Sequence, residues 1–183
     1  MERIHLRQLQ EDDRELFGLA FREEPGNEET GNVWIDMMFQ TCLMHSEDEM
    51  AILLGENDEW CGYCTVFYKE NDIPELAINL RPEYQGRGIG AEALRQMMSY
   101  VREKQGFKRF VVKTKKTNIR FQRMCEKLGA EFEGEVPDPL EQIFKMLEEK
   151  IGTVEYQKKM GDTPLEFEPV LQYVLDISED VYE

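Results

Sequence analysis

A glycine-rich turn stands between an alternating apolar segment and the most regular helical pattern in the chain. The segment ELAINL, residues 75–80, has the alternation of a strand, and the turn QGRGIG follows it at residues 85–90. Unpaired backbone N–H groups converge at a helix N-terminus, and the helix dipole is positive there, so such a turn can bind a pyrophosphate. On spacing alone, phosphate binding and an ordinary tight connection are equally good interpretations. The sequence has no GxxxxGK[ST] motif, and the dinucleotide pattern GxGxxG lacks its third glycine.

The turn resembles the signature of the GCN5-related N-acetyltransferase (GNAT) superfamily, which reads Q/R-x-x-G-x-G/A after a strand that ends near a proline. Gln85, Gly88 and Gly90 match this signature, and Pro82 follows the strand. The resemblance continues through YQGRGIGAEALRQMM to NIRFQRMCEKLGA and covers roughly residues 2–160. It implies the acyl-CoA N-acyltransferase fold and acetyl-CoA as the acetyl donor, with no metal.

The resemblance also implies how the cofactor would bind. The main chain of the turn would hold the CoA pyrophosphate, and the strand before it would separate from its neighbour and pair with pantetheine. An N–H group near Leu80 would then polarise the thioester carbonyl. Asn118 occupies a position that contacts the pantetheine arm in the family, although a helix N-cap is the alternative role. The cofactor-binding residues implied are Ile78, Asn79, Leu80, Gln85, Gly86, Arg87, Gly88, Ile89, Gly90, Ala91 and Asn118.

Two residues are candidates for proton transfer. Glu75 matches a glutamate that some family members place at this strand position, where it would accept the proton of the attacking amine; the alternative is a solvated carboxylate at the strand start. Another family position for an acid falls on Lys113. Cys125 stands where the family frequently has a tyrosine that protonates the departing thiolate. A thiol could donate that proton, but packing on the Phe121 and Leu128 face is the alternative.

The expected function is transfer of an acetyl group from acetyl-CoA to a primary amine of a small molecule or peptide, by direct attack on the thioester. The alternative is a catalytically weak or inactive CoA-binding regulatory or interaction module. A formal net charge of −16 argues against binding nucleic acid or an anionic membrane surface. It would attract a cationic acceptor, although an acidic balance more often reflects solubility alone. The charged N-terminal segment and the lack of a long apolar run predict a cytoplasmic protein, and a homodimer is possible.

The pair Cys61 and Cys64 raises the question of a redox or zinc site. Residues three apart in a strand point to opposite faces, and no second ligand pair completes a tetrahedral site. We therefore expect structural thiols here.

The elements that must position these residues alternate between strand and helix patterns, which predicts a mixed α/β fold. The resemblance implies that its central sheet is mostly antiparallel and flanked by helices. We expect one domain at 1–160, with a helix inserted near 138–150, and an acidic extension at 161–183 packed on it. Strands are expected at 4–10, 50–55, 61–68, 75–80, 110–112, 130–135 and 153–160, and further helices at 11–21, 34–45, 88–106 and 118–128.

Overall fold

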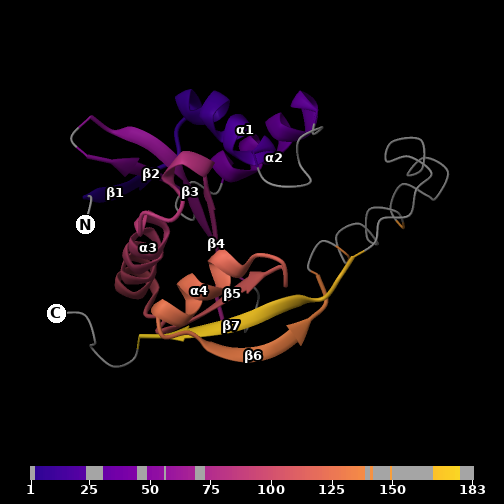
Figure 1. Cartoon of the computed structure of the whole chain (residues 1–183). Coiled ribbons are helices and arrows are strands. Elements are labelled where there is room, and N and C mark those ends of the chain that lie inside the picture. Colours follow the sequence, from indigo (N-terminus) through magenta and orange to yellow (C-terminus); the bar gives the residue numbers. More distant parts are fainter. Residues whose placement is uncertain are drawn as a thin grey trace.

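The computed structural model describes residues 3–23, 31–44, 49–55, 57–68, 73–138 and 167–177, together with residues 141 and 149. Strands and helices alternate within them, as the sequence pattern predicts (Figure 1). The elements are β1 (Ile4–Gln8), η1 (Glu11–Asp13), α1 (Arg14–Arg22), α2 (Asn32–Met44), β2 (Glu49–Leu54), β3 (Glu59–Phe67), β4 (Glu75–Leu80), η2 (Pro82–Tyr84), α3 (Ile89–Gln105), β5 (Arg109–Thr114), α4 (Ile119–Lys127), β6 (Glu131–Val136) and β7 (Val170–Asp176).

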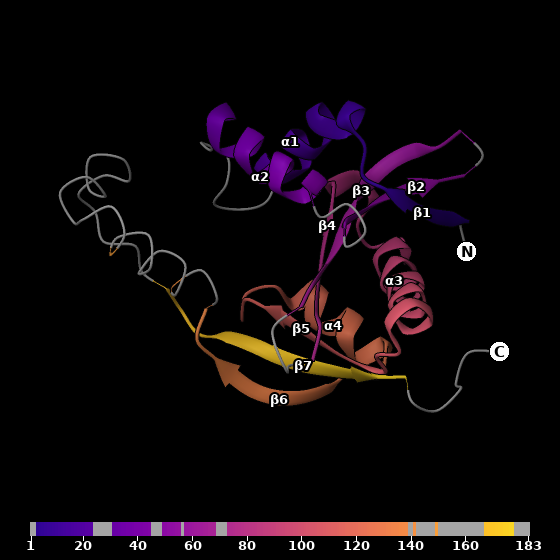
Figure 2. The same cartoon turned by 180° about the vertical axis from the view of Figure 1, so that it is seen from behind.

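These strands form one sheet in the order β1-β2-β3-β4-β5-β7-β6. All neighbouring strands are antiparallel except β4 and β5, which are parallel. Helices α1 and α2 pack on one face of the first half of the sheet, and α3 lies on the opposite face (Figure 2). The predicted fold class, a mostly antiparallel sheet flanked by helices, is confirmed.

Helix α3 follows the apolar pattern that predicted it. Ala93, Leu94, Met97 and Val101 fall on one face and are completely buried against the sheet. Burial of each large apolar side chain contributes on the order of 1.5–3 kcal/mol. The helix ends at Gly106, which adopts a left-handed conformation with φ of 80°.

A β-bulge in β3 corrects the expectation that Cys61 and Cys64 point to opposite faces. Ile52 of β2 pairs with Gly62, whereas the next residue of β2 pairs with Trp60, so Cys61 is the extra residue of the bulge. Both thiols consequently join the core cluster on the α3 face. All four cysteines of the chain are free and buried, which agrees with a structural role.

The β3 bulge lies beside a close approach of β3 and β4. A Cβ atom built on Gly62 would stand 2.1 Å from the main-chain oxygen of Asn79. Only glycine lets the two backbones come this close. The glycine therefore fixes where the end of β4 lies, shortly before η2 and the glycine-rich turn.

Strands β4 and β5 separate soon after they meet. Their pairing is limited to Glu75 with Val111 and Leu76 with Val112. The rest of β4 keeps its partner on the β3 side, through Leu80. The sheet is therefore splayed along the second half of β4, as the resemblance implied.

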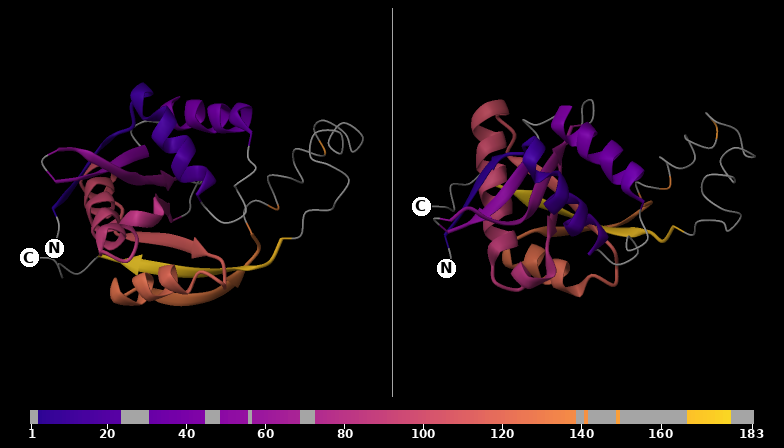
Figure 3. Two further views of the ribbon diagram at one scale, coloured as in Figure 1. Left: turned by 45° about the horizontal axis from the view of Figure 1, so that its top comes forward. Right: turned by 90° about the horizontal axis from the view of Figure 1, so that it is seen from above.

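The last strand comes from the segment assigned to the acidic extension. β7 lies between β5 and β6 and pairs with both (Figure 3). The expected strand at 153–160 and most of the helix expected near 138–150 lie outside the described residues; residues 141 and 149 have helical backbone. The division at 160 and 161 stays a prediction.

Neither a membrane-spanning helix nor a cluster of metal-ligating side chains occurs in the described part of the chain. No helix there is long and apolar enough to cross a membrane. The same residues contain no cluster of three or more histidine, cysteine, aspartate or glutamate side chains that could hold a metal ion.

Candidate active site

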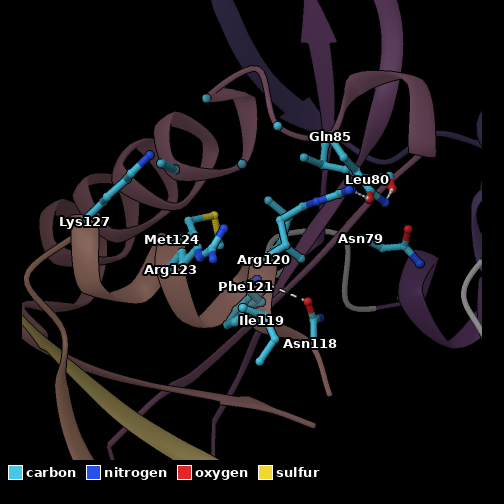
Figure 4. A pocket seen from close by; sticks show the side chains of 15 residues that line it. Asn79, Leu80, Gln85, Asn118, Ile119, Arg120, Phe121, Arg123, Met124 and Lys127 are labelled. Carbon is cyan, nitrogen blue, oxygen red and sulfur yellow. Dashed lines mark hydrogen bonds between the residues drawn. The ribbon is translucent and has the colours of Figure 1, made fainter. Parts of the chain in front are cut away.

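A pocket of about 400 Å³ lies between the end of β4, the glycine-rich turn, the start of α3 and the helix α4 (Figure 4). The elements that build it are far apart in the sequence. The pocket lies where the splay of the sheet leaves β4 without a strand neighbour. Of the predicted cofactor residues, Arg87 and Ile89 do not line it. Those that line the pocket are Ile78, Asn79, Leu80, Gln85, Gly86, Gly88, Gly90, Ala91 and Asn118.

The glycine-rich turn places the N-terminus of α3 at the pocket. Gly86 and Gly88 have φ values of 75° and 86°, in the left-handed region that favours glycine. A Cβ atom at either position would have no heavy atom within 4 Å. The first intrahelical bond runs from Glu92 to Gly88, so the N–H groups before Glu92 are available to a ligand. This geometry suits an anion.

The main-chain N–H and C=O groups of every second residue of β4 point into the gap between β4 and β5. The N–H of Val111 donates to the carbonyl of Pro74 at 2.8 Å, whereas the N–H of Arg81 donates to Cys61 of β3 at 3.0 Å. Because main-chain groups in a strand point to the same side at every second residue, Ile78 and Leu80 direct theirs into the splay.

Asn79 differs from the expectation at this point. By the same alternation its main chain faces β3, where it lies opposite Tyr63, so it does not offer pantetheine a backbone edge. Pairing with pantetheine remains open only to its two neighbours in the strand. The side chain of Asn79 is buried, with its amide nitrogen 3.4 Å from the carbonyl oxygen of Ala20.

Gln85 ties three parts of the site together. Its Nε2 donates to the carbonyl of Leu80 at 2.7 Å, and its Oε1 accepts a hydrogen bond from Arg120 of α4. The turn, the end of β4 and the start of α4 are thus joined through one side chain. The carbonyl of Leu80 is occupied, and its N–H points into the splay.

Basic side chains of α4 line the pocket and were missed by the sequence reasoning. Arg120, Arg123 and Lys127 recur at helical spacing on one side of the helix. They concentrate positive charge beside the turn, in a chain whose formal net charge is −16. Their spacing after Asn118 was the signal that could have identified them.

Asn118 has the geometry of both of its expected roles. Its Oδ1 accepts a hydrogen bond from the N–H of Phe121 at 3.1 Å and caps α4. The residue also lines the pocket. The cap is confirmed, and the contact with pantetheine stays a prediction.

Glu75 and Lys113 form an ion pair beside the point where β4 and β5 separate. Lys113 Nζ lies 2.6 Å from Glu75 Oε2, and the two side chains are only 14% and 17% exposed. Neither residue lines the pocket. The carboxylate proposed as the proton acceptor is therefore held in an ion pair with Lys113.

Cys125 lies in the hydrophobic core and not at the pocket. The residue is completely buried, and burial raises the pKa of its thiol to about 12. Its neighbours Arg123 and Met124 line the pocket, whereas Cys125 does not. This position opposes the proposed role in protonating a thiolate and favours the packing alternative.

Comparison with known proteins gives one family and one fold. The sequence matches the acetyltransferase (GNAT) domain over residues 3–131. No curated protein matches it.

Three solved structures have the same fold at low identity. An acetyltransferase of the GNAT family from Bacillus anthracis has a TM-score of 0.70 at 14% identity, with 98% of this chain and 100% of that chain covered. A spermidine N-acetyltransferase SpeG chimera from Vibrio cholerae and hSSAT has a TM-score of 0.68 at 12% identity, with 96% of each chain covered. The protein yncA from Salmonella typhimurium, solved with its cofactor acetyl-CoA, has a TM-score of 0.61 at 14% identity, with 99% of this chain and 98% of that chain covered.

Proposed function

This chain belongs to the GNAT family of acetyltransferases, and on that premise we propose that it transfers an acetyl group from acetyl-CoA to a primary amine of a small molecule or peptide. The observation that carries the proposal is the open edge of β4 next to the glycine-rich turn. A cofactor with a phosphate group at one end and an extended amide chain at the other matches this arrangement in order.

The residues present fit CoA. Gly86 and Gly88 leave open the space that a Cβ atom would fill, and the free N–H groups at the start of α3 can bind the pyrophosphate. The positive charge of Arg120, Arg123 and Lys127 suits the phosphates. Ile78 and Leu80 present main-chain groups to the amides of pantetheine.

Bound acetyl-CoA would supply an activated thioester. The N–H of Leu80 points into the splay and would hold the carbonyl oxygen of the thioester, while the carbonyl of Leu80 is bonded to Gln85. The separation of β4 from β5 leaves room for the acyl group in the splay. Glu75 would accept the proton of the amine directly or through water, provided that the amine displaces Lys113 from it.

A cationic acceptor suits the charge of this protein. The net charge of −16 attracts amines that carry further positive charges. The SpeG chimera with the same fold is a spermidine N-acetyltransferase, which illustrates such an acceptor. A polyamine and a basic peptide are therefore the first acceptors to test.

The second candidate function is a CoA-binding module with little or no chemistry. Two observations favour it: Cys125 is buried away from the pocket, and the carboxylate of Glu75 is paired with Lys113. Neither of the groups proposed for proton transfer is in place for it.

Thiol release distinguishes the two functions. The protein is incubated with acetyl-CoA and one amine at a time: spermidine, glucosamine or a lysine-rich peptide. Released CoA is measured with a thiol reagent. All four cysteines are buried, so their contribution to the signal is small. Amine-dependent release supports transfer. Tight CoA binding by calorimetry without such release supports the module, and absence of CoA binding contradicts both.

A further inference from the structure

The side chain of Asn79 has a buried oxygen with no hydrogen-bond partner. The residue is only 5% exposed, and its Oδ1 is one of three buried side-chain polar atoms without a partner among the described residues. Burial of an unpaired polar atom is destabilising, and native structures contain few of them. The atom therefore requires an explanation.

A structural role explains the position of the side-chain nitrogen of Asn79 but not that of its oxygen. The carbonyl of Ala20 lies in the last turn of α1, and the Nδ2 of Asn79 approaches it at 3.4 Å. A carbonyl can only accept, so this contact requires the nitrogen to face Ala20 and the oxygen to face elsewhere. The helix end thus fixes the orientation of the amide but makes no use of Oδ1.

The position of Asn79 places this oxygen beside the proposed reaction site. Leu76, Ile78 and Leu80 pack in the core on the α3 face, so the residues between them, Ala77 and Asn79, stand on the α1 face. Figure 4 shows the side chain of Asn79 pointing away from Asn118 and α4. Asn79 is also part of the pocket lining, directly between the two residues whose main chain opens into the splay.

The chemistry of the missing partner follows from the atom itself. An amide oxygen accepts hydrogen bonds, so the partner must carry an N–H or O–H group. The thioester carbonyl of the acetyl donor can only accept. The amides of pantetheine would form hydrogen bonds with the main-chain groups of Ile78 and Leu80, which point into the splay and not toward α1. The remaining donor in the reaction is the amine.

We propose that Oδ1 of Asn79 accepts a hydrogen bond from the N–H of the acceptor amine, which approaches the thioester from the α1 face of β4. This inference rests on the proposed acetyl transfer and identifies a substrate-binding residue for it. A neutral amide holds the amine in place but does not take its proton.

The test is the variant Asn79→Leu, which has similar size and no polar atoms. We expect the KM for the best amine of the panel to rise about tenfold, while the affinity for CoA changes by less than threefold because the main chain of Asn79 faces β3. The melting temperature should change little, since the variant loses the contact with Ala20 but also removes the unpaired oxygen.

A matched control is Tyr100→Phe on α3, outside the pocket lining, which removes a buried hydroxyl that, like Oδ1 of Asn79, has no hydrogen-bond partner among the described residues. It should leave both the amine KM and the CoA affinity unchanged. An amine KM in Asn79→Leu equal to that of the unmodified protein overturns the inference and leaves acetyl transfer standing. Loss of CoA affinity without a change in amine KM overturns it as well, because the side chain would then serve the cofactor. An unmodified protein that binds CoA but acetylates no amine contradicts the proposed function itself and this inference with it.

Discussion

The two ends of α3 allow the role of the glycine-rich turn to be separated from its backbone strain. Gly88 precedes the helix with φ and ψ of 86° and −7°, and Gly106 follows it with 80° and 4°. A Cβ atom at either glycine would meet no heavy atom within 4 Å. Alanine should therefore cost the same at both positions, about 1–2 kcal/mol for a left-handed residue.

Of these two glycines, Gly88 lines the pocket and Gly106 does not, so Gly88→Ala places a methyl group where the pyrophosphate is proposed to bind, whereas Gly106→Ala does not. We expect Gly88→Ala and Gly106→Ala to lower the melting temperature equally, by about 2–8 °C for a chain of this size. CoA affinity should fall at least tenfold in Gly88→Ala, which corresponds to about 1.4 kcal/mol, and stay unchanged in Gly106→Ala. Calorimetric titration with CoA and thermal unfolding measure the two quantities. Equal CoA affinity in the two variants would refute the assignment of the turn.

Three further changes test other parts of the structure. Arg123→Gln should weaken CoA binding roughly threefold to tenfold at low salt, and the difference should shrink at high ionic strength because the contact is electrostatic; a salt-independent loss would contradict this reason. Gly62→Ala should destabilise the protein by at least about 1–3 kcal/mol in urea unfolding, since its Cβ would lie 2.1 Å from the main-chain oxygen of Asn79. Cys125→Ala should keep kcat within about twofold, whereas a proton donor would lose far more. The pKa of Cys125 rises from 9.0 to about 12 on folding, so the folded thiol keeps a proton that the unfolded one loses. Stability should therefore fall by about 1.4 kcal/mol per pH unit between about pH 9 and pH 12, and fall less in Cys125→Ala.

Local signals in the sequence predicted the elements that carry the cofactor site. The periodic apolar residues and terminal glycine of α3 are contained in one continuous segment, as is the cap of α4 by Asn118. The glycine-rich turn lies between such elements, so its position at a helix N-terminus follows from them. These features depend on residues that are close together in the sequence, so a local sequence pattern is enough to predict them.

Features that depend on pairing between distant strands were not predictable. The bulge at Cys61 is visible only in the register of β3 against β2. The ion pair of Glu75 with Lys113 requires β4 and β5 to lie side by side, and the side to which Asn79 turns its main chain requires knowledge of both neighbours of β4. β7 was missed because its partners β5 and β6 come from much earlier in the chain.

The splay in the sheet has a consequence for self-association. A strand with an unpaired edge is a template for strands of other molecules, and long exposed edges lead to aggregation. In β4 this edge is short, since pairing with β5 occupies its beginning and Gln85 occupies the carbonyl of Leu80 at its end. Only the main-chain groups of Ile78 and the N–H of Leu80 remain. A thin amide chain can satisfy these few groups, whereas an intruding β-strand would find too few partners to form a stable ladder.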